Sequence, residues 1–154
     1  MERKTFYNDR RKERAIDFLA DYRVVRRYFC RKHDLNQGDF EFLVKLHSLG
    51  TFLRQDFKNN VHTLAWDHKR WDRMYGEWVV VYRERKPSEG RKYRIYTISN
   101  KAKTMVEDCY RILCGEKAIP EVKQFNPIMA EESYEDKRYA KAIKAFNAAR
   151  QETQ

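Results

Sequence analysis

The sequence predicts a mainly α-helical fold with a small β-hairpin. Apolar residues recur at helical spacing in several segments along the 154 residues. The segment 77–99 alternates instead with a period of two on both sides of Pro-Ser-Glu-Gly, which is typical of a hairpin. The hydrophobic share of 42% is sufficient for a packed core. We therefore expect one globular chain built mostly from helices.

The first predicted helix covers residues 9–33. Phe18, Tyr22, Val25 and Phe29 recur at i, i+4, i+7 and i+11, which places them on one face. Lys and Arg cover the opposite face. An apolar stripe of this width needs a partner, so we expect this helix to take part in dimerisation.

The second predicted helix lies within residues 34–50 and should be buried on nearly every side. Asn36 is a suitable N-cap, and Asp39 falls in the first turn, where the helix dipole favours negative charge. Gly50 is suited to the position that follows the last turn. The helix is therefore expected to support its neighbours from the core.

Two further helices precede the hairpin. The first is short, at 51–60, and Thr51 is its expected cap. The second covers about 62–75 and ends near Gly76. A short Asn-containing turn between two helices is typical of a helix-turn-helix.

The predicted helix over 62–75 has two different faces. Trp71 and Met74 fall on an apolar side, and Trp78 on the following strand can join them. Trp66 falls among cations on the other side, with Lys69, Arg70 and Arg73. Trp66 either packs against a terminal helix or a dimer mate, or it stacks on nucleic acid; both interpretations stay open.

The remainder of the chain contains the hairpin and two more helices. The turn and shoulders of the hairpin hold five cations, namely Arg83, Arg85, Lys86, Arg91 and Lys92. Ser99 is expected to cap a helix over about 100–114. After a Pro-containing connector, Ser133 is expected to begin a helix over 133–151. Its apolar face contains Tyr139, Ile143 and Phe146.

This order of elements predicts a winged helix-turn-helix, in which the basic hairpin is the wing. Residues 35–114 resemble the MarR-type winged-helix regulators, through "LNQGDFEFLVKLHSLG" and "VVVYRERKPSEGRKYRIYTISNKAKTMVEDCYRIL". The resemblance implies a DNA-binding domain over 35–114. It also implies dimerisation segments at 1–34 and 115–154.

Charge favours a nucleic-acid partner. The net charge is +10, and a basic protein of this size commonly meets a polyanion, although a basic surface can also serve solubility alone. We expect a homodimer to bind double-stranded DNA, with the helix over 62–75 in the major groove and the wing on backbone or minor groove. The expected DNA contacts are Arg54, Lys58, Asn60, Thr63, Trp66, Lys69, Arg70, Arg73, Arg85, Lys86, Arg91 and Lys92. The expected dimer contacts are Phe18, Tyr22, Val25, Phe29, Tyr139, Ile143 and Phe146.

Other classes of protein receive no support from the sequence. No Gly-rich phosphate loop or catalytic triad pattern is present, so we expect neither an enzyme nor a cofactor. Cys30, Cys109 and Cys114 lack metal-ligand spacing and are expected to be buried. Without an apolar run of about 20 residues or a signal peptide, a cytoplasmic protein is expected. Two alternatives remain open: a module that binds a protein of the transcription machinery or a host factor, and a non-specific architectural nucleic-acid binder.

Overall fold

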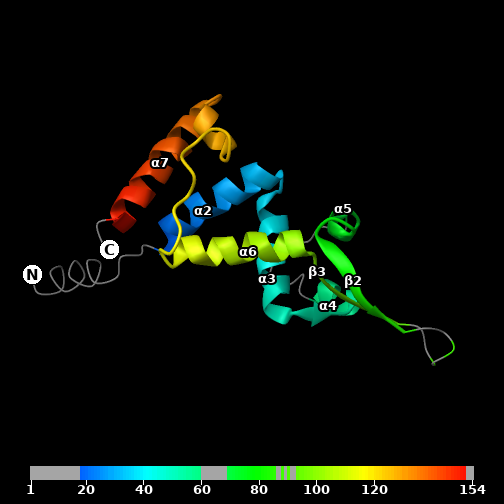
Figure 1. Cartoon of the computed structure of the whole chain (residues 1–154). Coiled ribbons are helices and arrows are strands. Elements are labelled where there is room, and N and C mark those ends of the chain that lie inside the picture. The colour runs from blue at the N-terminus through cyan, green and yellow to red at the C-terminus, as the bar shows by residue number, and fades with distance from the viewer. Residues whose placement is uncertain (1–17, 60–68, 86–87, 89, 91–92, 152–154) are drawn as a thin grey trace, which may run out of the picture. The chain divides into compact units, whose positions relative to one another are not determined.

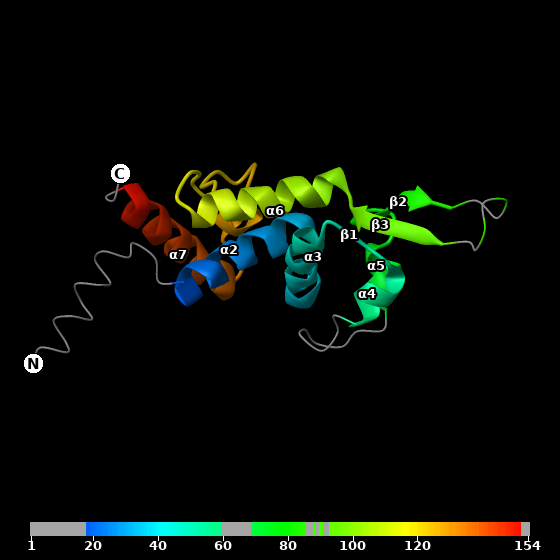
Figure 2. The same cartoon turned by 90° about the horizontal axis from the view of Figure 1, so that it is seen from below.

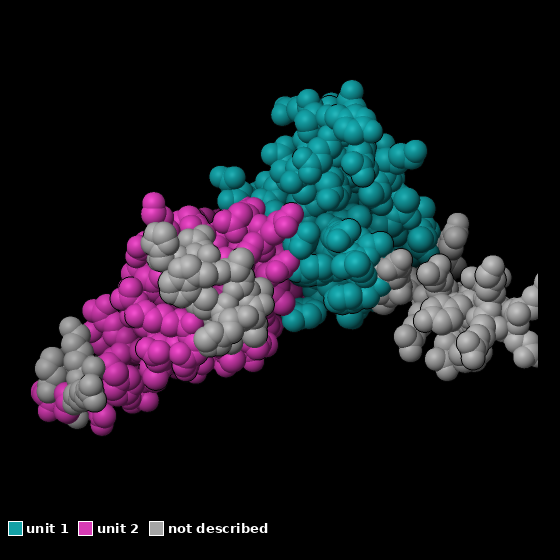
Figure 3. Space-filling view, turned by 180° about the vertical axis from the view of Figure 1, so that it is seen from behind, with its two compact units in different colours: residues 1–34, 109–154 teal, residues 35–108 magenta. Residues whose placement is uncertain are grey.

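A computed structural model describes residues 18–59, 69–85, 88, 90 and 93–151. Helices dominate these ranges, and one small antiparallel sheet accompanies them (Figures 1 and 2). The chain divides into two compact units (Figure 3). The central unit comprises residues 35–108, and the terminal unit combines residues 1–34 with residues 109–154.

The central unit combines helices with a three-stranded sheet of order β1-β3-β2. Its elements are α3 (Gln37–Leu49), β1 (Thr51–Phe52), α4 (Arg54–Asn59), α5 (Arg70–Met74), β2 (Val79–Glu84), β3 (Arg94–Ile98) and the first part of α6 (Asn100–Leu113). The predicted mainly helical fold with a small hairpin is confirmed. The sheet has one strand more than the sequence predicted, because β1 pairs with β3.

Helix α3 begins and ends where the sequence predicted. The Asp39 backbone N–H donates to the Asn36 side-chain oxygen at 2.7 Å, which caps the helix. Gly50 follows the last turn with a φ of 76°, a conformation that glycine adopts without a steric penalty. Phe40, Phe42 and Leu46 are fully buried, so the central position expected for this helix is confirmed.

Thr51 does not cap a helix, which corrects the prediction. It pairs with Thr97 of β3, and Phe52 pairs with Tyr96. The Asp56 carboxylate instead accepts a hydrogen bond from the Leu53 N–H at 2.9 Å, at the start of α4. The edge of β3 that does not pair with β2 can form backbone hydrogen bonds with Thr51 and Phe52. Thr and Phe are also residue types that are favoured in strands.

The terminal unit contains α2 (Phe18–His33), the end of α6, the 3₁₀ helix η3 (Pro127–Ala130) and α7 (Tyr134–Gln151). Helix α7 packs against α2 and η3. Ser133 caps α7 as predicted, because its Oγ accepts a hydrogen bond from the Asp136 N–H at 3.1 Å. Asn147 ties α7 to the connector, since its amide group both accepts from the Ile119 N–H and donates to the Ile119 carbonyl oxygen.

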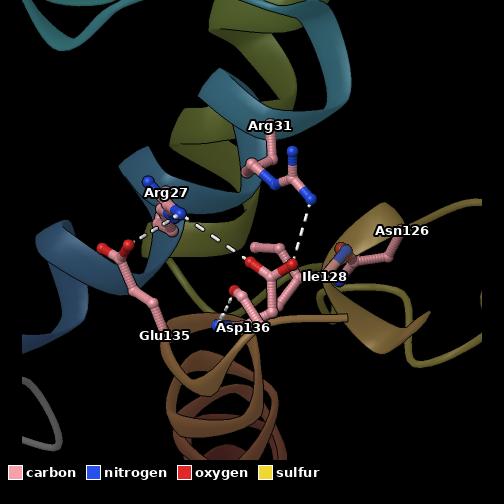
Figure 4. Close-up of polar contacts among 7 residues, drawn as sticks. Arg27, Arg31, Asn126, Ile128, Glu135 and Asp136 are labelled. Atoms are coloured by element: carbon pink, nitrogen blue, oxygen red, sulfur yellow. Dashed lines mark hydrogen bonds and ion pairs between the residues drawn. The ribbon is translucent and has the colours of Figure 1, made fainter. Parts of the chain in front are cut away.

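Asp136 performs a second task at the start of α7 (Figure 4). Its carboxylate accepts a hydrogen bond from Arg31 of α2 at 3.0 Å, and Arg27 of the same helix approaches it at 3.7 Å. A serine followed three residues later by an acidic residue is typical of a capping box, in which the Asp136 side chain would return to the Ser133 backbone. The carboxylate binds the two arginines of α2 instead.

The apolar stripes expected at a dimer interface are largely buried within the single chain. Val25, Phe29, Ile143 and Phe146 are all buried, because α2 and α7 belong to one packed unit and supply apolar surface to each other. Tyr22 and Tyr139 are half-buried, and Phe18 is 68% exposed. Four of the seven expected dimer contacts therefore pack within one chain, and dimerisation itself stays a prediction.

The three cysteines differ in exposure. Cys30 and Cys109 are buried, as the sequence predicted, whereas Cys114 is exposed. Cys114 follows the last residue of α6 and directly precedes Gly115, which has a φ of 84° and ends the helix. The exposure of Cys114 corrects the prediction that all three thiols are buried.

Candidate nucleic-acid interface

Asp39 holds α5 against the first turn of α3. The Arg70 Nε–H donates to Asp39 Oδ1 at 3.0 Å. Arg73 donates through Nη2 to Oδ1 at 2.7 Å and through Nε to Oδ2 at 3.2 Å. Such charge-assisted hydrogen bonds are about twice as strong as neutral ones. One carboxylate therefore fixes two arginines of α5.

Arg70 is not on an exposed face, which corrects the prediction. It is 3% exposed, and its guanidinium lies 5.2 Å from the centre of the Phe42 ring. A Cβ on Gly38 would lie only 2.6 Å from Arg70 Nη2, so the absence of a side chain at residue 38 makes room for the guanidinium. A buried carboxylate requires a cation, and Arg70 supplies it to Asp39.

Arg73 lies in an intermediate position. Its side chain is 40% exposed, but two of its nitrogen donors already bind Asp39. The sequence had placed Arg73 with Arg70 on the helix face expected to enter the major groove. The structure instead engages both guanidinium groups with a carboxylate.

Trp71 sits in a cluster of aromatic rings. It meets Phe57 and Tyr96 edge-on, at centroid distances of 4.9 and 4.8 Å, and it stacks on Tyr75 at 5.7 Å. Edge-to-face and offset-stacked pairs are the favoured aromatic geometries. Trp71 is half-buried, and Trp78 is buried, as their predicted core roles require.

One face of the β2–β3 hairpin presents arginine side chains. Arg83 pairs with Ile95 in the register, and the Arg85 N–H donates to the Tyr93 carbonyl oxygen at 3.0 Å. Paired residues project to the same side of a sheet, and residues two apart on one strand share a face. Arg83, Arg85 and Tyr93 therefore lie on one face, and the Arg85 guanidinium covers the Tyr93 ring at 5.4 Å. All three side chains are exposed.

The opposite face of the hairpin carries a neutral ion pair. Glu84 pairs with Arg94, and the Arg94 Nε–H donates to Glu84 Oε1 at 3.1 Å. This hydrogen bond and the charge of Glu84 raise the pKa of Arg94 above its ordinary value. The exposed positive charge of the described hairpin residues is thus concentrated on the side of Arg83 and Arg85.

An irregularity in the register decides which face the arginines occupy. Val81 pairs with Tyr96, but the next pair is Arg83 with Ile95, so β2 advances by two residues while β3 advances by one. A regular ladder would have placed Arg83 on the same side as Val81 and Tyr96. The extra residue, Tyr82, therefore turns Arg83 to the other face.

The predicted DNA contacts fall into three groups. Four of them, at the surface of the central unit, are exposed cations: Arg54, Lys58, Lys69 and Arg85. Arg70 and Arg73 are bound to Asp39, as described. Six lie outside the described residues: Asn60, Thr63, Trp66, Lys86, Arg91 and Lys92.

Three features of this surface depend on contacts between distant segments, and the sequence pattern did not predict them. The sequence placed Asp39 near a helix N-terminus but did not connect it with arginines more than 30 residues away. Tyr93 lies in the alternating segment 77–99 and was not among the expected DNA contacts, although its place opposite Arg85 is recognisable once the strand pairing is known. The register irregularity at Tyr82 has no marker such as glycine, so the alternating pattern concealed it.

No protein-family model matches the chain, and no curated protein or solved structure is significantly similar to it. In the part of the chain that the structure describes, no helix combines the length and apolar character needed to cross a membrane. The same residues contain no cluster of three or more His, Cys, Asp or Glu side chains arranged to hold a metal ion.

Proposed function

We propose that the chain is a dimeric, DNA-binding transcriptional regulator of winged helix-turn-helix type. The main support for this proposal is the exposed hairpin face of Arg83, Arg85 and Tyr93. The Glu84–Arg94 pair lies on the opposite face and does not neutralise the positive charge of this one. The net charge of +10 and the succession of helices before the hairpin support the same proposal.

In this proposal the hairpin arginines hold backbone phosphates or enter the minor groove. Helix α5 begins at Arg70 after a turn at Lys69, so the prediction of one helix over 62–75 is wrong at Lys69. Lys58 and Lys69 are exposed and would add phosphate contacts beside α5. Arg70 would instead position that helix, since its guanidinium is buried against Asp39. Affinity would therefore depend mainly on phosphate contacts and fall steeply with salt.

A salt titration of duplex binding tests the hairpin. The double variant R83A/R85A should bind more weakly than wild type, and the slope of log K against log salt should fall by about 1.8, which is two phosphate contacts. The matched control is R111A/R138A, which removes the same charge from exposed positions on α6 and α7. Equal slopes for both double variants would refute a specific role of the hairpin.

A second candidate is a non-specific nucleic-acid binder, and the burial of Arg70 favours it. Arg70, one of the two arginines expected on the major-groove face, is buried and cannot contact a base there. Selection of bound duplexes from a random pool separates the candidates. Enrichment of a near-palindromic motif supports the dimeric regulator, whereas a pool without enrichment supports the non-specific binder.

The dimer is a separate part of the proposal, because the stripe residues that carried it are largely buried in one chain. Light scattering of the purified protein measures the mass directly. A protein mass of twice the chain supports the dimer, either for the free protein or for the complex after the mass of the DNA is subtracted. A monomer under both conditions would leave one winged helix per binding site and would remove the symmetry expected of the motif.

A further inference from the structure

Three side chains of the central unit form a continuous stack that reaches the surface. The Arg54 guanidinium lies 5.1 Å from the centre of the Trp71 ring. The Trp71 ring stacks on Tyr75, with a centroid distance of 5.7 Å and an angle of 23° between the ring planes. Tyr75 is 43% exposed although it also meets Tyr96 edge-on. Arg54, Trp71 and Tyr75 together form the aromatic ledge.

The aromatic ledge lies on the side of the sheet opposite the hairpin arginines. Tyr96, which contacts both Trp71 and Tyr75, pairs with Val81, and Val81 is 37% exposed. The register irregularity turns Arg83 away from this side. The ledge is therefore a second surface, separate from the face assigned to duplex phosphates.

The chemistry of the aromatic ledge fits bases with a free π-face. Proteins hold single-stranded nucleic acid by stacking bases on aromatic side chains while nearby cations bind the phosphates. Tyr75 supplies an exposed ring whose orientation is maintained by Trp71 and Tyr96. Arg54 and Lys58 of α4 are exposed cations, and Arg54 is part of the stack itself.

Charge favours a nucleic acid over a protein as the occupant. The chain has a net charge of +10, and the cation of the ledge is exposed and lies over the Trp71 ring. A polyanion with flat, apolar bases matches both properties. We propose that the aromatic ledge binds unpaired bases of single-stranded nucleic acid, with a base stacked on Tyr75 and phosphates held by Arg54 and Lys58.

The stacking is tested with two ligands that differ only in their bases. Fluorescence anisotropy compares labelled oligo(dT) with an abasic deoxyribose-phosphate oligomer of the same length. Wild type should prefer oligo(dT) by at least about fivefold, the lower range for one stacked base. Y75F keeps the ring and should keep this preference. Y75L removes the ring and should bind both oligomers equally.

Tyr110 of α6 provides the matched control. It is 44% exposed, so Y110L removes a tyrosine of the same accessibility from another element. Y110L should retain the wild-type preference for oligo(dT). Thermal unfolding of Y75L and Y75F checks that a loss of preference does not come from a loss of folded protein.

Two results would overturn the proposal. One is equal binding of oligo(dT) and the abasic oligomer by wild type, and the other is an unchanged preference in Y75L. Light scattering can give a third such result. If the wild-type protein self-associates and Y75L does not, while the preference for oligo(dT) is unaltered, the ledge binds a second copy of the chain.

The test also separates this inference from duplex binding, on which it does not depend. Base stacking releases no counterions, so Y75L should lower the affinity for oligo(dT) by the same factor at every salt concentration. R83A/R85A should instead reduce the salt slope for duplex DNA. Single-strand binding by the ledge and duplex binding by the hairpin face can therefore be refuted independently.

Discussion

Asp39 and Arg70 form a buried ion pair that joins α3 to α5: the Arg70 Nε lies 3.0 Å from Asp39 Oδ1, and the two side chains are 6% and 4% exposed. Both groups are removed from water, so each depends on the other for compensation. The pair explains why a helix of five residues is held in place. It also removes Arg70 from the surface.

Asp39→Asn should strongly destabilise the central unit. The substitution leaves the Arg70 guanidinium buried without its counter-charge, and breaking a buried pair in this way costs about 3–5 kcal/mol. Urea unfolding measures the loss. Glu77→Gln is the control, because it removes the exposed Lys101–Glu77 pair and should cost less than about 1 kcal/mol. Equal effects of the two substitutions would contradict the buried pair.

Gly38→Ala should destabilise the protein only while Arg70 is present. The new Cβ would displace the Arg70 guanidinium and weaken a charge-assisted hydrogen bond, a loss of about 1–3 kcal/mol that exceeds the helix-propensity gain of up to about 1. In an Arg70→Met background the same alanine should be neutral or stabilising. The free energies of unfolding of the four proteins give the coupling between residues 38 and 70, and no coupling would refute the close approach.

Asp136→Asn should destabilise the terminal unit far more than Glu135→Gln. Asp136 is buried and binds Arg31 at 3.0 Å, whereas the neighbouring Glu135 side chain is 60% exposed and meets Arg27 at 3.4 Å. We expect a loss of about 2–4 kcal/mol for the first substitution and below about 1 for the second. Hydrogen exchange of α7 amides locates the loss, which should concentrate in the first turns of the helix. Comparable losses for the two would show that burial does not govern these contacts.

Thiol labelling of the native protein should modify one cysteine quickly. Cys114 is exposed, whereas Cys30 and Cys109 are buried. Burial also raises the pKa of the Cys109 thiol to about 12, so at pH 8 almost none of it is the reactive thiolate. Titration with a chromogenic disulfide should release about one equivalent rapidly and three in denaturant. Cys114→Ser should abolish the rapid phase, and its persistence would contradict the assignment.

The sequence by itself determined the type and approximate bounds of most elements. The periodicity of apolar residues predicted α3 and α6, and the local chemistry of Asn36, Ser99 and Gly50 placed their ends. Alternation on both sides of the turn predicted the pairing of β2 with β3. These features depend on residues within a few positions of one another, so a linear pattern contains them.

Only the tertiary structure decided what the helix faces contact. The sequence assigned Arg70 to the outside because it is charged, but a buried carboxylate 31 residues earlier makes the inside favourable for it. The apolar stripes of α2 and α7 indicated that each helix packs against another apolar surface, but not which one. In the structure the two helices pack against each other within one chain. A single extra residue at Tyr82 likewise decides the face that Arg83 occupies. Each outcome depends on contacts between distant segments, for which a local pattern holds no information.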